Sequence, residues 1–272
     1  MLAIKNNLMA ANAARHLGRS YDALARSVER LSSGLRINSA KDDAAGLAVR
    51  ELMRADIAVL EQGARNAQDG VSMLQTMEGA MATIDEALVR MQQLAEQAST
   101  GSYSSAQRVI MHNEFDEMRQ EVDRIAGATK FNNIAMLSNS ATVSIHFGEL
   151  ATDKIDIVGS NLTSAAGGLG ITALAITTVT SAKTALTTLD TAIGTKDTAR
   201  AKFGYKMNRL EGTVSVIGIQ AENLLAAESR ISDVDVATEM AAMTRNQVLA
   251  QAGIAMLAQA NSMPQMALSL LR

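Results

Sequence analysis

The sequence predicts a mainly α-helical protein: an elongated rod of long antiparallel helices, with paired terminal helices and one small β-hairpin region. Three observations support this class. Apolar residues recur in steps of three and four along most of the 272 residues, which is the spacing of a helix that packs along another helix. The chain has a single proline, Pro264, and it has 16 Met but only 3% aromatic residues. Proline would break long helices, whereas Met fits them well.

Each end of the chain has the apolar spacing of a helix that packs along another helix. Near the N-terminus apolar residues follow a heptad pattern: Leu17, Tyr21, Leu24, Val28, Leu31 and Leu35. Ser33-Gly34 interrupts this pattern, and a polar connector follows to residue 43. A last helix begins near residues 232–233 and carries Val236, Met240, Met243, Ala250, Ile254 and Leu257. We expect these helices to pair as a coiled coil, in a domain made of residues 1–43 and 229–272.

The interior of the chain predicts a helical rod domain, residues 44–228. Its first helix spans about 45–99, and its second, about 104–128, opens with a capping box of Ser104 and Gln107. A third helix spans about 178–226, and the cations Lys196 and Arg200 at core positions of its pattern predict a less buried stretch.

Between the second and third of these helices the period changes to two, which is typical of strands. Alternating apolar residues predict one β-hairpin: Val143, Ile145 and Phe147, then Ile155 and Ile157. The Gly-, Ser- and Thr-rich residues 159–177 predict a surface excursion, so the variable region as a whole spans about 139–177.

The residues give no indication of catalysis or of a cofactor. Cysteine is absent, which excludes disulfide scaffolds and thiolate metal sites, and the three histidines, His16, His112 and His146, are scattered. The paired carboxylates Asp42-Asp43 and Asp233-x-Asp235 each lie near a helix start, where acidic groups favour the helix dipole. We therefore expect helix capping at these positions, no metal site and no enzyme.

Charge and hydropathy limit the partners and the location. The net charge is −3, so no basic field predicts binding to nucleic acid or to an anionic membrane. The first nine residues contain no apolar block of signal-peptide length, so we expect no cleaved signal peptide, and secretion would need a different exporter. A rod of this kind has a thin core and leaves apolar surface exposed, so we expect other copies to cover it in an open helical assembly.

Several motifs, in order along both ends of the chain, resemble those of bacterial flagellins. They are Ser32–Ala48, Lys130–Leu137, Asn208–Glu211, Ala227–Asp235, Gln251–Asn261 and Pro264–Arg272. The resemblance covers about residues 1–140 and 178–272. Because the middle is so short, the chain resembles a short flagellin that lacks large outer domains.

The resemblance implies a structural subunit that self-assembles into the extracellular filament of the bacterial flagellum, which drives swimming. The terminal helices would line an inner tube, with assembly residues Leu17, Leu24, Val28, Leu31, Met240, Met243, Ile254 and Leu257. Besides copies of itself, the implied partners are the flagellar type III export apparatus, a flagellin chaperone, the filament cap and the hook–filament junction proteins.

Two further implications concern host recognition. The motif that Toll-like receptor 5 reads in some flagellins maps onto Arg90, Leu94 and Glu114, although neighbouring residues depart from its strongest form. The C-terminal leucines resemble those read by cytosolic sensors: Leu268, Leu270 and Leu271. Residues 202–207, Lys-Phe-Gly-Tyr-Lys-Met, also depart from the family, where a smaller, Gln-bearing stretch is commoner.

Three alternatives remain at this point. The first is a hook–filament junction protein, which shares weaker versions of both ends but would not polymerise alone. The second is a secreted, membrane-inserting translocator, and the run 157–182 without charge is too rich in Ser and Thr to favour it. The third is a coiled-coil signalling protein.

Overall fold

The computed structural model describes residues 6–270, apart from the side chains of residues 264, 265 and 267–270. Five helices dominate it: α1 (Leu8–Ser33), α2 (Ala44–Ser99), α3 (Ser105–Ala128), α4 (Val179–Ser232) and α5 (Val236–Leu270). Four short strands lie between α3 and α4: β1 (Lys130–Phe131), β2 (Ile134–Ala135), β3 (Thr142–His146) and β4 (Lys154–Val158). The predicted mainly α class, with a small β-hairpin, is confirmed.

The chain divides into two compact units. Unit 1 is Met1–Ala55 with Glu222–Arg272, and unit 2 is Asp56–Ala221. Both divisions fall inside long helices, between residues 55 and 56 of α2 and between residues 221 and 222 of α4.

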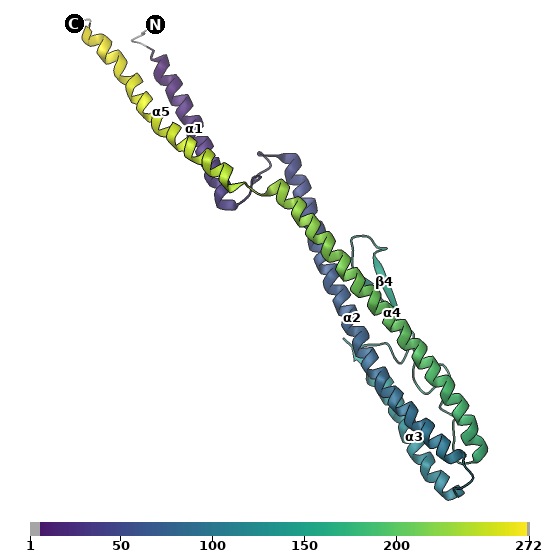
Figure 1. Cartoon of the computed structure of the whole chain (residues 1–272). Helices are drawn as coiled ribbons and strands as arrows, with labels where there is room; N and C mark the ends of the chain where they lie inside the picture. The colour runs from purple at the N-terminus through teal and green to yellow at the C-terminus, as the bar shows by residue number, and fades with distance from the viewer. Residues whose placement is uncertain (1–5, 271–272) are drawn as a thin grey trace. The chain divides into compact units, whose positions relative to one another are not determined.

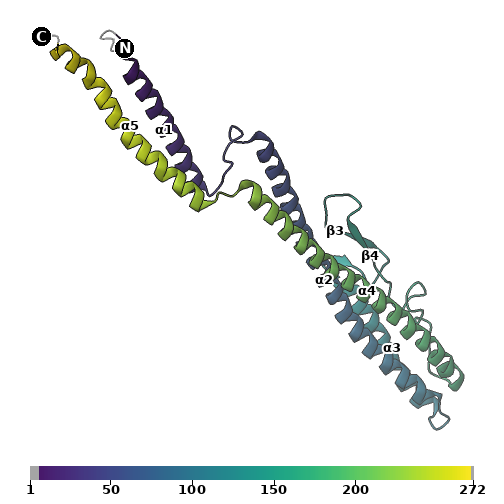
Figure 2. The same cartoon turned by 45° about the horizontal axis from the view of Figure 1, so that its top comes forward.

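In unit 1, α1 and α5 lie side by side and run in opposite directions (Figures 1 and 2). The side-chain amide of Asn7, just before α1, donates to the carbonyl of Ala260 near the far end of α5 (2.7 Å). At the other end of the pair, Arg30 forms an ion pair with Glu239 (3.7 Å). The start of α1 and the end of α5 therefore meet at the same end of the unit.

The connectors of unit 1 are paired with each other. Gly34 ends α1 in the left-handed conformation (φ 74°), which suits glycine. Its carbonyl accepts from Val234 N (3.0 Å), and Arg36 N donates to the carbonyl of Ser232 (2.6 Å). The Arg36 guanidinium also donates to the carbonyl of Ile231 (2.6 Å), which satisfies an acceptor at the end of α4.

In unit 2, α2 and α3 form an antiparallel hairpin, and α4 runs along α2 in the opposite direction (Figure 1). Ser104 and Gln107 make the predicted capping box at the start of α3. Arg108, which is buried, donates to the carbonyls of Ala98 (2.9 Å) and Thr100 (2.8 Å), so a charged side chain closes the end of α2.

The core of unit 2 is built from Met, Leu, Ile and Ala with little aromatic content. Its largest fully buried side chains include Met77, Met81, Leu88, Met91 and Phe115. Lys196 is buried as well, at 2% exposure, so the expectation that seam cations mark a less buried stretch is wrong for this residue. Its ammonium binds the carboxylates of Asp85, on α2, and Asp197, and these hydrogen bonds outweigh the effect of burial and raise the pKa of Lys196.

The strands form two antiparallel hairpins. The predicted one pairs β3 with β4, and Ile155 and Ile157 of β4 are fully buried. Its turn lies directly on α2, because a Cβ at Gly63 would stand 2.6 Å from the carbonyl carbon of Phe147. The smaller hairpin, β1 with β2, turns through Asn132 and Asn133, both with positive φ, and it adds to the single hairpin that the sequence predicts.

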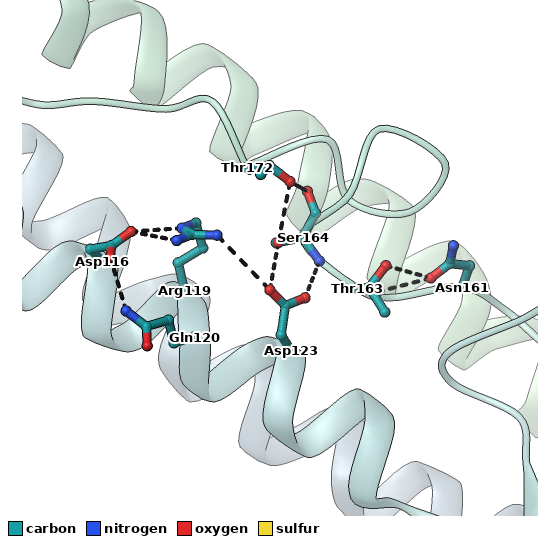
Figure 3. Close-up of polar contacts among 8 residues, drawn as sticks. All are labelled: Asp116, Arg119, Gln120, Asp123, Asn161, Thr163, Ser164 and Thr172. Carbon is teal, nitrogen blue, oxygen red and sulfur yellow. Dashed lines mark hydrogen bonds and ion pairs between the residues drawn. The ribbon is translucent and has the colours of Figure 1, made fainter.

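Residues 159–177 are packed into unit 2, which contradicts the expected surface excursion. Leu162, Ile171 and Ile176 are fully buried. Figure 3 shows how the carboxylate of Asp123, on α3, accepts from the backbone N (2.7 Å) and hydroxyl (2.6 Å) of Ser164. The segment has no regular spacing of apolar residues, so its composition alone suggests solvent exposure.

Candidate assembly surfaces

The seam between α1 and α5 follows a heptad, with a register that differs in part from the sequence pattern. Leu17, Leu24 and Leu31 are half-buried in it, and they alternate with Ser20 and Ser27 rather than with the larger Tyr21 and Val28. On α5 the residues of the seam are Met243, Asn246, Ala250, Gly253, Leu257 and Ala260. A Cβ at Gly253 would stand 3.1 Å from the Leu17 side chain, so the two helices approach closely there.

Three of the proposed assembly residues lie outside this seam. Val28 is 50% exposed, Met240 45% and Ile254 50%. Small seam residues such as Ser27 and Gly253 let the backbones come together, and this turns the larger neighbours outward. Hydrophobic periodicity shows that α1 has an apolar face, but side-chain size at the contact decides the register, and hydrophobicity does not single out the serines.

The exposed side of α5 is apolar over much of its length. Large apolar side chains that are at least 45% exposed occur along it: Val236, Met240, Val248, Leu249, Ile254, Met256 and Met266. An open hollow of about 540 Å³ lies among Met240, Ala241, Thr244, Arg245, Val248 and Leu249. An apolar surface this long is typical of a protein-interaction site.

One aspartate of each predicted pair caps a helix start of unit 1, Asp43 at α2 and Asp235 at α5, whereas Asp42 and Asp233 accept hydrogen bonds elsewhere. Asp235 accepts from the hydroxyl of Thr238 (2.7 Å) and from the backbone N of Ala237 (3.0 Å) at the start of α5. The hydrogen bond from the Thr238 side chain is the main reason that the pKa of Asp235 is lowered. Asp43 accepts from Gly46 N (2.9 Å) at the start of α2.

The residues mapped to receptor recognition lie in unit 2. Arg90, on α2, and Glu114, on α3, form an ion pair (2.5 Å) in which each side chain is nearly half exposed. Leu94, one turn further along α2, is 2% exposed and belongs to the core. Leu271 and the side chains of Leu268 and Leu270 lie outside the described residues.

Within the described part of the chain, no group of three or more His, Asp or Glu side chains is placed to hold a metal ion. None of its helices combines the length and hydropathy needed to cross a bilayer.

The geometry and the surfaces define a class: a helical subunit whose terminal helix pair presents a long apolar face to other molecules. Two family models match the chain. The bacterial flagellin N-terminal helical region matches residues 4–142, and the bacterial flagellin C-terminal helical region matches residues 186–271.

Relatives match over their whole length. A flagellin of Halalkalibacterium halodurans is 41% identical over 270 residues, with 99% of each chain covered. Flagellin FlaB2 of Treponema pallidum is 40% identical over 284 residues, again with 99% of each chain covered. The short length of this chain is therefore shared by its relatives.

Solved structures agree on the fold. The crystal structure of Bacillus cereus flagellin has a TM-score of 0.52 and 31% identity, and the match covers 60% of this chain and 94% of that one. A putative flagellar hook-associated protein from Vibrio parahaemolyticus has a TM-score of 0.60, with 71% of this chain and 100% of that one covered. At 14% identity the second likeness shows a shared fold alone, so it does not favour the junction-protein alternative.

The chain belongs to the bacterial flagellin family. It is a structural subunit that assembles with copies of itself into the flagellar filament, the extracellular structure of bacterial motility.

Proposed function

We propose that the terminal helix pair, residues 1–43 and 229–272, forms the inner tube of the filament, and that residues 44–228 form the wall around it. The exposed apolar face of α5 carries this proposal. A pair of helices buries one seam on each partner, and in α5 the side chains of Val248, Ile254 and Met256 remain at least half exposed outside that seam. In a polymer of this chain, other copies bury them.

A point variant tests this proposal. Ile254 is half exposed, so Ile254→Asp disturbs the α1–α5 seam little, while an assembled copy would have to bury a carboxylate. We expect the critical concentration for polymerisation to rise at least about tenfold, which corresponds to roughly 1.4 kcal/mol. The matched control is Gln251→Asp, which adds the same charge at an exposed polar position of α5.

Sedimentation of polymer against monomer, with electron microscopy of the pellet, measures this effect. Circular dichroism of both variants checks that the helices remain. Equal critical concentrations for Ile254→Asp, the control and the unaltered protein would refute the inner-tube assignment.

The route out of the cell and the other flagellar partners follow from the family and are part of this proposal. We expect export through the flagellar type III apparatus, with a chaperone that covers the apolar face of α5 before export. The cap and the junction proteins would contact the ends of the polymer. A structural role needs neither a catalytic group nor a cofactor.

Recognition by Toll-like receptor 5 is a second proposal, favoured by the exposed ion pair of Arg90 and Glu114. Because Leu94 is buried, it would act by holding this pair in place. In a receptor reporter assay with monomeric protein, Arg90→Ala is expected to weaken the response at least about tenfold, whereas Arg124→Ala, at another exposed ion pair, should not. Equal responses would refute the assignment.

A further inference from the structure

A group of cations stands out on the exposed side of α4. From Arg200 to Arg209 there are four cations and no carboxylate, yet unit 2 as a whole has 18 Asp and Glu against 13 Lys and Arg, a net charge of −5. Arg200 is paired with Glu78 (3.0 Å). The remaining three, Lys202, Lys206 and Arg209, are called the α4 basic patch below.

The patch is available for contact. Lys202 and Arg209 are exposed, and neither forms an ion pair with any residue that the structure describes. Between them Tyr205 is 70% exposed, an unusual position for an aromatic side chain in a chain with three tyrosines and no tryptophan. Lys206 and Arg209 both lie near the β3–β4 hairpin. Arg209 lines a hollow with Glu149 and Asp153 of its turn. The pKa of Asp156 is lowered mainly by the hydrogen bond from the Ser144 side chain, and the charge of Lys206 adds to this effect.

Opposite charge with matching spacing occurs on another helix of the same unit. Glu114, Glu117 and Glu121 lie on one side of α3 at steps of three and four. The first and the last are seven positions apart, as Lys202 and Arg209 are on α4. Both helices run opposite to α2, so α3 and α4 point the same way. Glu117 is exposed and has no ion-pair partner among the described residues, whereas Glu114 and Glu121 have arginine partners.

We propose that the α4 basic patch binds a second copy of this chain, at the α3 acidic stripe of Glu114, Glu117 and Glu121. The inference rests on the polymer function and names one contact within it. Because unit 2 is acidic overall, a basic patch on one copy meets an attractive field from a neighbouring copy. Tyr205 adds apolar area beside the charges, and aromatic side chains of this kind are frequent at interfaces.

The contact is asymmetric, since it joins different surfaces of two identical copies. Such a contact leaves one patch and one stripe free after each addition, which is the geometry of an open polymer. Complementary charge fixes partner and register more than it adds affinity.

A charge swap on the full-length protein tests the proposal. Lys202→Glu and Glu117→Lys each place like charges across the contact, and we expect each to raise the critical concentration for polymerisation at least about tenfold. A chain that carries both substitutions restores an opposite pair, so its critical concentration should return to within about threefold of the unaltered value. Lys183→Glu is the matched control, because Lys183 is an exposed lysine of α4 outside the patch.

The outcomes separate the two claims. Failure of the unaltered protein to polymerise would count against its function as a filament subunit. Normal polymerisation by Lys202→Glu, or a double variant no better than the single ones, would overturn the contact while leaving that function intact. Urea unfolding of the monomers should give equal stability for the unaltered protein and its four variants.

Discussion

Two glycines of α2 should respond in opposite ways to the same substitution. Gly63 lies under the turn of the β3–β4 hairpin, where an added Cβ would fall 2.6 Å from the carbonyl carbon of Phe147 and 2.9 Å from its Cα. Gly79 is exposed, with no atom within 4 Å of the same Cβ position. Both glycines are far from the ends of α2.

The magnitudes decide the sign at each position. Alanine favours a helix interior over glycine by about 1 kcal/mol, so Gly79→Ala should stabilise the monomer by about that amount. At Gly63 the atoms in the way are backbone, the nearest being the carbonyl oxygen of Phe147, so the hairpin has to move by about an ångström to reach ordinary contact. That shift also strains the bond from the Asn66 amide to the carbonyl of His146 (3.0 Å). Overpacking costs about 1–3 kcal/mol, and a clash with backbone belongs at the upper end of that range, so Gly63→Ala should be destabilising by about 2 kcal/mol after the gain of about 1 kcal/mol in propensity.

Urea unfolding of the monomeric variants, followed by circular dichroism at 222 nm, measures both changes. Hydrogen exchange of β3 and β4 should speed up in Gly63→Ala and remain unchanged in Gly79→Ala. Equal stabilisation by the two substitutions would refute the packing of the hairpin turn on α2.

Three further predictions follow from the polar contacts. Lys196→Ala should lower the free energy of unfolding by about 2–3 kcal/mol, and Lys196→Met by less than half of that. Met keeps the buried aliphatic part of the side chain, and the partly exposed Asp85 regains contact with water. Urea unfolding of both variants measures the two losses, and equal losses would contradict this prediction. Asp123→Ala removes the acceptor of the Ser164 backbone N and one of the two partners of its hydroxyl, so amide exchange in 159–177 should accelerate at least about tenfold while the middle of α2 stays protected; unchanged exchange would contradict the anchoring. The pKa of Asp235 is lowered from 3.8 in the folded chain, so its stabilising effect is present above that value and is lost as the pH falls below about 4. The difference in Tm between the unaltered protein and Asp235→Ala should therefore shrink between pH 6 and pH 3. A constant difference would contradict the assignment of Asp235 as a helix cap.

Heptad spacing was sufficient to predict the helices, because a long helix that packs on another must repeat its apolar residues every three to four positions. The capping box at Ser104 and the hairpin around Val143 and Ile155 could likewise be predicted, because each depends on residues close together in the sequence. These features need no knowledge of distant contacts.

Features that depend on partners far apart in the sequence could not be predicted from it. The burial of Lys196 depends on Asp85, which lies 111 residues earlier on another helix. The packing of 159–177 depends on Asp123, and nothing in that polar segment indicates its anchor. At the candidate site, hydrophobic spacing predicts the apolar faces of α1 and α5. It does not predict the close approach of the two helices at Gly253, which determines which leucines face inward.

Chemical labelling can test most directly whether other copies cover the exposed face of α5. The chain has no cysteine, so Ile254→Cys provides a single thiol at a half-exposed position of α5. The account predicts rapid reaction with a maleimide in the monomer and protection of at least about a hundredfold in the polymer, as burial in an interface requires. Equal rates in monomer and polymer would show that this face remains exposed to solvent and would contradict the account.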